Sequence, residues 1–143
     1  MGTPEGQRRA LVVTLAAYSV ALAVVLLAPT SSHQSEAASW LGDVGSWFGV
    51  PERFRTQSRV EFVCNALILM PVSALGSLVW PRVGWREWTT YAFIISCAVE
   101  LTQGLLLPNR TVATADVVAN TLGGLGGALA VAAWWRLRRR SAA

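Results

Sequence analysis

Long apolar runs, separated by polar segments, are the main feature of this chain. A helix needs about 20 mainly apolar residues to cross the hydrocarbon core of a bilayer, and four runs reach this length. They cover residues 10–28, 60–80, 88–107 and 115–135. The pattern predicts an all-α polytopic membrane protein in which a bundle of four transmembrane helices makes up a single domain, residues 1–143.

Composition supports this prediction. Of the 143 residues, 53% are hydrophobic and only 14% are charged, and the mean hydropathy is +0.44. An ordinary soluble domain of this length is less apolar. The first run is longer than the apolar core of a signal peptide, which has about 7–15 residues. A retained first helix is therefore favoured over a cleaved signal peptide.

The 12 basic residues are unevenly distributed between the two sides of the predicted bundle. Eight lie before the first run, between the second and third runs, or after the fourth, and four lie in the other two loops. Because basic loops stay on the cytoplasmic side, we expect both termini in the cytoplasm and a multi-pass protein of the cytoplasmic membrane. A net charge of +4 distributed in this way does not indicate a nucleic-acid partner.

Tryptophan positions agree with this orientation, since indole rings favour the membrane–water interface. Five of them fall at the predicted cytoplasmic interface: Trp80, Trp85, Trp88, Trp134 and Trp135. The long outer loop, residues 30–59, carries Trp40, Trp47 and Phe48 at helical spacing. Two interpretations of this loop remain open, a short helix lying on the outer membrane surface or a loop packed over the bundle.

Polar residues in three of the runs are predicted to lie at one depth. At 1.5 Å per residue, Asn65, Gln103 and Asn120 lie roughly 6–7 Å below the outer end of their helices. Glu100 lies about 10 Å deep. Polar groups in lipid need partners, so these side chains are expected to meet in the outer leaflet.

Glu100 is the most informative of these residues, because a carboxylate within a span must be paired, protonated or exposed to a wet cavity. Arg110, in the short loop that follows, is its expected partner, with Asp116 close by. Asp116 also fits a plain helix-capping role, and Asn65 and Asn120 fit interhelical hydrogen bonding. Ser58 and Glu61 fit a capping box at the start of the second run.

The fourth run contains a stripe of small residues. Ala119, Gly123 and Gly127 recur at every fourth position, which allows helix backbones to approach closely. A nucleotide-binding glycine loop is excluded, because the stripe follows no strand and lacks the required spacing. No catalytic triad or metal-ligand set is evident, so no cofactor and no metal are expected.

Several of these residues together resemble the VanZ-like family of bacterial membrane proteins. The resemblance covers residues 61–130 and rests on "NALILMP", "ELTQ", an arginine and "DVVANTLGGLGG". The family's characteristic residues then fall on Asn65, Pro71, Glu100, Gln103, Arg110, Asp116, Asn120, Gly123 and Gly127. The resemblance implies a role at the cell envelope, since the family is similar to a protein linked to low-level teicoplanin resistance.

Three hypotheses for function follow. The leading one is a non-enzymatic factor that binds membrane lipid, a lipoglycopeptide or a lipid-linked cell-wall precursor at the outer-leaflet polar site. The second is a membrane-embedded enzyme that uses Glu100 and Asp116 as acid and base or as oxygen ligands for a hard cation. A small transporter is the third, although the inner half of each run is nearly free of polar residues. The sequence does not indicate an oligomeric state.

Overall fold

A computed structural model describes residues 4–27, 32–107 and 113–141 of the chain, and the described part contains helices and no strand. The elements are α1 (Pro4–Leu26), α2 (Ser32–Trp47), a 3-10 turn η1 (Glu52–Phe54), α3 (Gln57–Val79), α4 (Trp85–Leu106) and α5 (Thr114–Ser141). Helices α1, α3, α4 and α5 are long and apolar enough to cross a membrane. The predicted all-α polytopic fold with four spans is confirmed.

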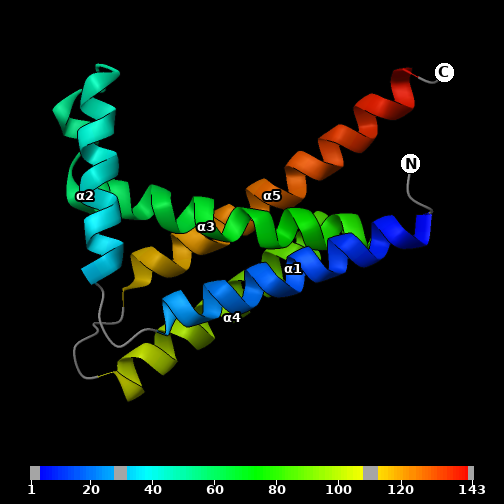
Figure 1. Ribbon diagram of the computed structural model, residues 1–143, viewed down its shortest axis with the longest axis horizontal. Coiled ribbons are helices and arrows are strands. Elements are labelled where there is room, and N and C mark those ends of the chain that lie inside the picture. Colours follow the sequence, from blue (N-terminus) through cyan, green and yellow to red (C-terminus); the bar gives the residue numbers. More distant parts are fainter. Residues whose placement is uncertain (1–3, 28–31, 108–112, 142–143) are drawn as a thin grey trace.

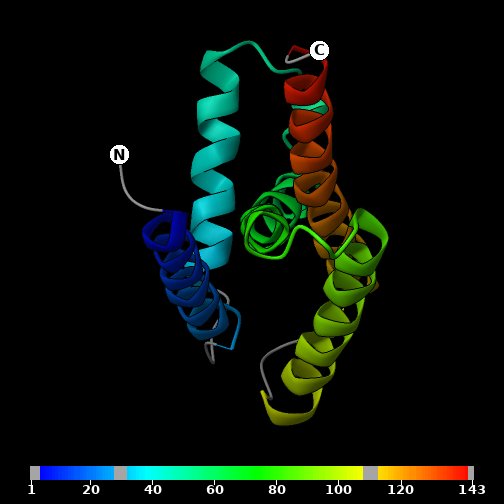
Figure 2. The same ribbon diagram turned by 90° about the vertical axis from the view of Figure 1, so that its right-hand side faces the viewer.

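Helix α3 lies at the centre of the arrangement. It packs along α5 over the most extensive interface and along α1 on another side, while α4 packs mainly on α5. Figure 2 shows α3 nearly end-on, between α1 and α5. In Figure 1, α1 begins and α5 ends at the same end of the bundle. We call this the terminal end, and we call the opposite end, which α2 crosses, the α2 end.

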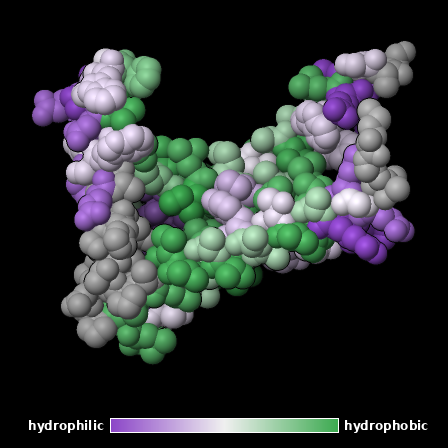
Figure 3. Space-filling model, in the orientation of Figure 1, coloured by the Kyte–Doolittle hydropathy of each residue, from purple (hydrophilic) through white to green (hydrophobic). Residues whose placement is uncertain are grey.

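The surface has the polarity of a membrane protein. Figure 3 shows a hydrophobic middle section with polar residues gathered at both ends of the bundle. Large apolar side chains such as Val63, Ile94 and Leu105 are exposed, whereas most of the buried apolar residues are alanines. This inverted distribution places the large residues against lipid and leaves small residues at the helix contacts.

Glycines make the contact between α5 and α3 possible. A Cβ atom at Gly123 would overlap the carbonyl group of Ala66, and one at Gly127 would overlap the carbonyl oxygen of Met70. Gly124 is similarly close to the side chain of Ala92 on α4. Because any side chain at these positions would separate the helices, the small-residue stripe determines how closely α5 approaches its neighbours.

Helix α2 runs across the bundle instead of along it (Figure 1). It packs on α3 and buries Ala38, while Trp40 is exposed and Trp47 and Phe48 are each 82% exposed. The outer loop therefore contains a real helix with an aromatic surface, and this helix also covers one end of the bundle. The helix packs on α3 over this end of the bundle, and its position on the outer membrane surface remains a prediction.

The start of α3 differs from the expected capping box. The helix begins at Gln57 with Thr56 at the N-cap position, and no side chain caps it. The carboxylate of Glu61 instead accepts a hydrogen bond from the amide Nε2 of Gln57, at 2.8 Å. The prediction that Ser58 and Glu61 form a capping box is wrong, because the N-cap lies two residues earlier, at Thr56, and the Glu61 side chain bonds Gln57 on the surface of the helix.

Candidate functional site

Three polar side chains are buried near the α2 end, on α4 and α5. Glu100, Gln103 and Asn120 are only 4%, 5% and 6% exposed. Asn65 on α3 and Asp116 in the first turn of α5 are half-buried. Burying a polar group without a hydrogen-bond partner is costly in free energy. The hydrogen-bond partners of Glu100 and Gln103 explain why these two side chains are buried.

Glu100 reaches from α4 to the beginning of α5. Its Oε2 atom accepts a hydrogen bond from the backbone N–H of Ala113, at 2.8 Å. Ala113 directly precedes α5, so the carboxylate satisfies one of the amides that a helix start leaves free. It also lies at the positive end of the helix dipole. Glu100 therefore acts as a cap supplied by a neighbouring helix.

The expected ion pair between Glu100 and Arg110 remains a prediction, because Arg110 lies outside the described residues. Glu100 and Asp116 each make further interactions, so neither is without a partner. The backbone N–H of Asp116 donates to the carbonyl oxygen of Ala113 at 2.9 Å. Ala113 thus bonds the side chain of Glu100 through its N–H and the backbone of Asp116 through its carbonyl oxygen.

Gln103 connects α4 to α1. Its Nε2 atom donates a hydrogen bond to the backbone carbonyl oxygen of Leu26, at 2.6 Å. Leu26 is the last residue of α1, where carbonyl groups have no partner within the helix. Gln103 and Glu100 therefore play matched roles, one at the end of α1 and the other at the start of α5.

Asn65 and Asn120 lie next to the closest contact between α3 and α5. Asn65 precedes Ala66, whose carbonyl group meets Gly123, and Asn120 lies one turn before Gly123. Both residues therefore belong to the α2 end of this interface. Ala119 is fully buried beside Asn120, and Pro71 lies within α3.

Tyr18 makes a polar contact between helices that sequence reasoning missed. Its hydroxyl donates to the backbone carbonyl oxygen of Ile68, at 2.6 Å, and so joins α1 to α3. The acceptor lies three residues before Pro71, in the turn where a proline ring disturbs the regular hydrogen bonds of a helix. A polar ring in the middle of the first apolar run was the signal available in the sequence.

Thiols and acidic groups do not gather into a metal-binding cluster within residues 4–27, 32–107 and 113–141. Cys64 and Cys97 are free, half-buried thiols on different helices. The chemistry that the described part of the site offers is thus a carboxylate, amide groups and helix ends.

Comparison with known proteins supports the resemblance seen in the sequence. The family model for VanZ/LLP1 matches residues 15–136, a range that includes α2 and all of the polar residues described above. Searches of curated proteins and of solved structures give no match. Because the family match covers most of the chain, the protein belongs to the VanZ/LLP1 family.

Proposed function

We propose that this protein is a binding factor of the cytoplasmic membrane that holds the polar part of an amphiphile at the α2 end of the bundle, in the outer leaflet. The candidate ligands are a lipoglycopeptide of the teicoplanin type and a lipid-linked cell-wall precursor. Both carry a long hydrocarbon chain and a large polar group, which matches an apolar bundle with polar side chains at one end.

The burial of Glu100 is the observation that carries this proposal. A carboxylate that is 4% exposed within a membrane-spanning helix is expensive, and such residues usually serve a function. Capping α5 requires only an acceptor at Ala113, which a neutral side chain would also supply. We infer that the buried carboxylate, besides capping α5, also accepts from a cationic or hydrogen-bond-donating group on the ligand.

The aromatic surface of α2 supports the same proposal. Trp40 and Trp47 on the helix that crosses this end are exposed, as is Phe48 directly after it. Exposed aromatic rings on a helix at an interface favour contact with lipid or with an acyl chain. The polar site and this aromatic surface together would contact both parts of an amphiphile.

A direct binding experiment tests the proposal. The full chain in lipid nanodiscs is titrated with fluorescent teicoplanin, with a glycopeptide that lacks the acyl chain, and with a polyprenyl-linked wall precursor. We expect an amphiphilic ligand to bind. Glu100→Gln should weaken its affinity about tenfold, which corresponds to ~1.4 kcal/mol of binding free energy. Glu61→Gln is the matched control, since Glu61 lies at the same end but bonds Gln57 on the surface of its own helix.

Equal affinity in wild-type protein and both variants would contradict a ligand site at Glu100. An enzyme that uses Glu100 and Asp116 as acid and base is the second candidate, since the Glu100 side chain bonds Ala113, three residues before Asp116. Chemical change of the wall precursor during the titration, measured by mass spectrometry and lost in Glu100→Gln, would favour the enzyme over the binding factor.

A further inference from the structure

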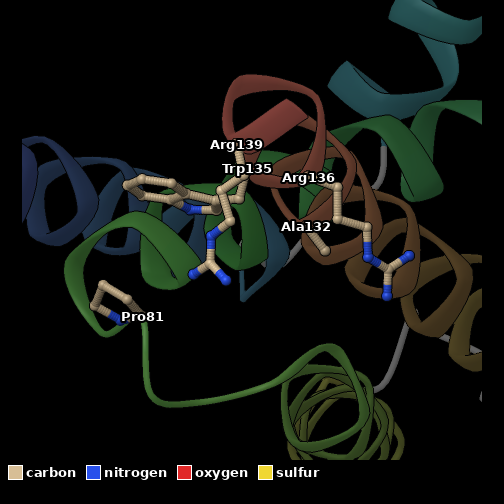
Figure 4. A pocket seen from close by; sticks show the side chains of 5 residues that line it. All are labelled: Pro81, Ala132, Trp135, Arg136 and Arg139. Carbon is tan, nitrogen blue, oxygen red and sulfur yellow. The ribbon is translucent and has the colours of Figure 1, made fainter. Parts of the chain in front are cut away.

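A hollow lies far from the polar site, at the terminal end of the bundle. It has a volume of about 360 Å³ and is lined by Pro81, Ala132, Trp135, Arg136 and Arg139. This volume is within the range of about 300–1,000 Å³ that is usual for small-ligand sites. Figure 4 shows the two guanidinium groups on the same side of α5, with Ala132 between them and the indole ring of Trp135 beside one of them.

Aromatic residues place this hollow at the membrane interface. Trp80 and Trp88 pack with ring centroids 6.2 Å apart, and Trp134 and Trp135 pack at 5.0 Å. Tryptophan side chains favour the level of the lipid headgroups. Arg136 follows directly, and Arg139 lies about 6 Å beyond Trp135 along the helix. From this spacing we expect both guanidinium groups at the level of lipid phosphates.

The chemistry of the lining selects an anion with an apolar part. Two arginines one turn apart can each donate a pair of hydrogen bonds to phosphate oxygens. No acidic side chain is among the lining residues, so the lining as a whole is cationic. Ala132 and Trp135 add an apolar wall on the membrane side.

We propose that this hollow binds the phosphate headgroup of an anionic diacyl phospholipid, in the leaflet that adjoins the terminal end. Basic pockets between membrane helices bind such headgroups in other proteins. The proposal is independent of the ligand at Glu100.

The other two arginines of the same helix end supply a control. The guanidinium of Arg138 lies over the ring of Trp134, at 4.3 Å from its centroid, and neither Arg138 nor Arg140 lines the hollow. A double variant Arg136→Gln/Arg139→Gln therefore removes the proposed site. The variant Arg138→Gln/Arg140→Gln removes the same charge from the same segment and leaves the hollow intact.

Native mass spectrometry of the full chain, released from nanodiscs that contain equal amounts of phosphatidylglycerol and phosphatidylcholine, tests the proposal. We expect wild-type protein and Arg138→Gln/Arg140→Gln to retain one phosphatidylglycerol. Retention should fall about tenfold in Arg136→Gln/Arg139→Gln. If this double variant does not fold, the single variants Arg139→Gln and Arg140→Gln are compared instead. We then expect only Arg139→Gln to lose the bound phosphatidylglycerol.

Three results would overturn the proposal. Equal loss in the two double variants would show diffuse attraction to a basic helix end. Equal retention of phosphatidylglycerol and phosphatidylcholine by wild-type protein would show that charge is not recognised. Displacement of the lipid by millimolar inorganic phosphate would identify a site for free anions instead of a lipid site.

Discussion

Glu100 and Gln103 show how two buried polar side chains are accommodated within the bundle. Each contacts a backbone group at a helix end, Ala113 at the start of α5 and Leu26 at the end of α1. These are the groups that a helix leaves without internal partners, and in lipid they are costly when unsatisfied. One turn of α4 thus satisfies the ends of two other helices.

Substitutions at Glu100 should separate its structural role from its charge. Glu100→Gln keeps an oxygen that can accept from Ala113, so we expect the helical fold and thermal stability to be retained. Glu100→Leu leaves that N–H without its acceptor and should lower the free energy of unfolding by about 1–3 kcal/mol. Thermal unfolding in detergent measures both effects, and equal stability of the two variants would show that the hydrogen bond to Ala113 contributes little.

The predicted pairing of Glu100 with Arg110 is tested by a double-mutant cycle on ligand binding. If the two residues act as a unit, Glu100→Gln combined with Arg110→Gln should cost less than the sum of the single losses, with a coupling of about 0.5–3 kcal/mol. Strictly additive losses would rule out the pair.

Gln103→Leu should loosen the end of α1 while leaving the rest of the bundle folded. It removes the hydrogen bond to Leu26, worth about 0.6–1.7 kcal/mol in a membrane protein. Hydrogen exchange in the last turn of α1 should rise. Thr102→Val is the control, because the Thr102 hydroxyl bonds the carbonyl oxygen of Ala98 in its own helix. An equal rise in both variants would contradict a role of the Gln103–Leu26 hydrogen bond in holding the end of α1.

At the scale of elements, the contact between α5 and α3 depends on the absence of side chains at particular glycines. Gly123 and Gly127 face backbone carbonyl groups, which cannot move aside without shifting a helix. Gly126 faces only the end of the Met70 side chain, with its Cε atom 3.2 Å from an added Cβ. These three glycines of α5 therefore differ in whether an added side chain can be accommodated.

Alanine substitution should reveal this difference. Gly123→Ala and Gly127→Ala should each destabilise the protein by about 1–3 kcal/mol through overpacking. Gly126→Ala should be neutral or stabilising, since a flexible methionine can adjust and alanine favours a helix. Thermal stability in one detergent compares the three variants, and equal tolerance would mean that α5 does not approach α3 as closely as described.

At the scale of the whole molecule, both chain ends belong to one side of the membrane. Helix α1 begins and α5 ends at the terminal end of the bundle (Figure 1), as four spans require. This end also carries Arg8, Arg9 and the arginines that follow Trp135. Since basic segments remain on the cytoplasmic side, we expect the terminal end to face the cytoplasm and α2 to face outward.

Reporter fusions test this orientation. A reporter joined after Ser35 or after Arg110 should be active only outside the cytoplasm, and one joined after Val83 only inside. An internal signal at Arg110 would show that the bundle has the opposite orientation, with the Glu100 site in the inner leaflet. Direct contact with extracellular lipoglycopeptides would then be excluded.

The sequence by itself determined the number of spans, and it singled out Glu100, Gln103 and Asn120, three of the polar residues that the structure buries. Apolar runs of about 20 residues leave few alternatives in a bilayer, and a carboxylate such as Glu100 has to face the bundle. The small-residue stripe at Gly123 and Gly127 also indicated a helix contact, because such residues have little other use on a membrane helix.

Only the tertiary structure decided which groups meet. The partners of Glu100, Gln103 and Tyr18 are backbone atoms of Ala113, Leu26 and Ile68. Every residue carries the same backbone groups, so sequence gives no signal that distinguishes one carbonyl or amide from another. Which helix ends come within hydrogen-bond distance depends on crossing angles and on the orientation of α2. Side-chain packing across several helices sets these angles and orientations. The pattern of apolar and polar residues within one helix does not encode them.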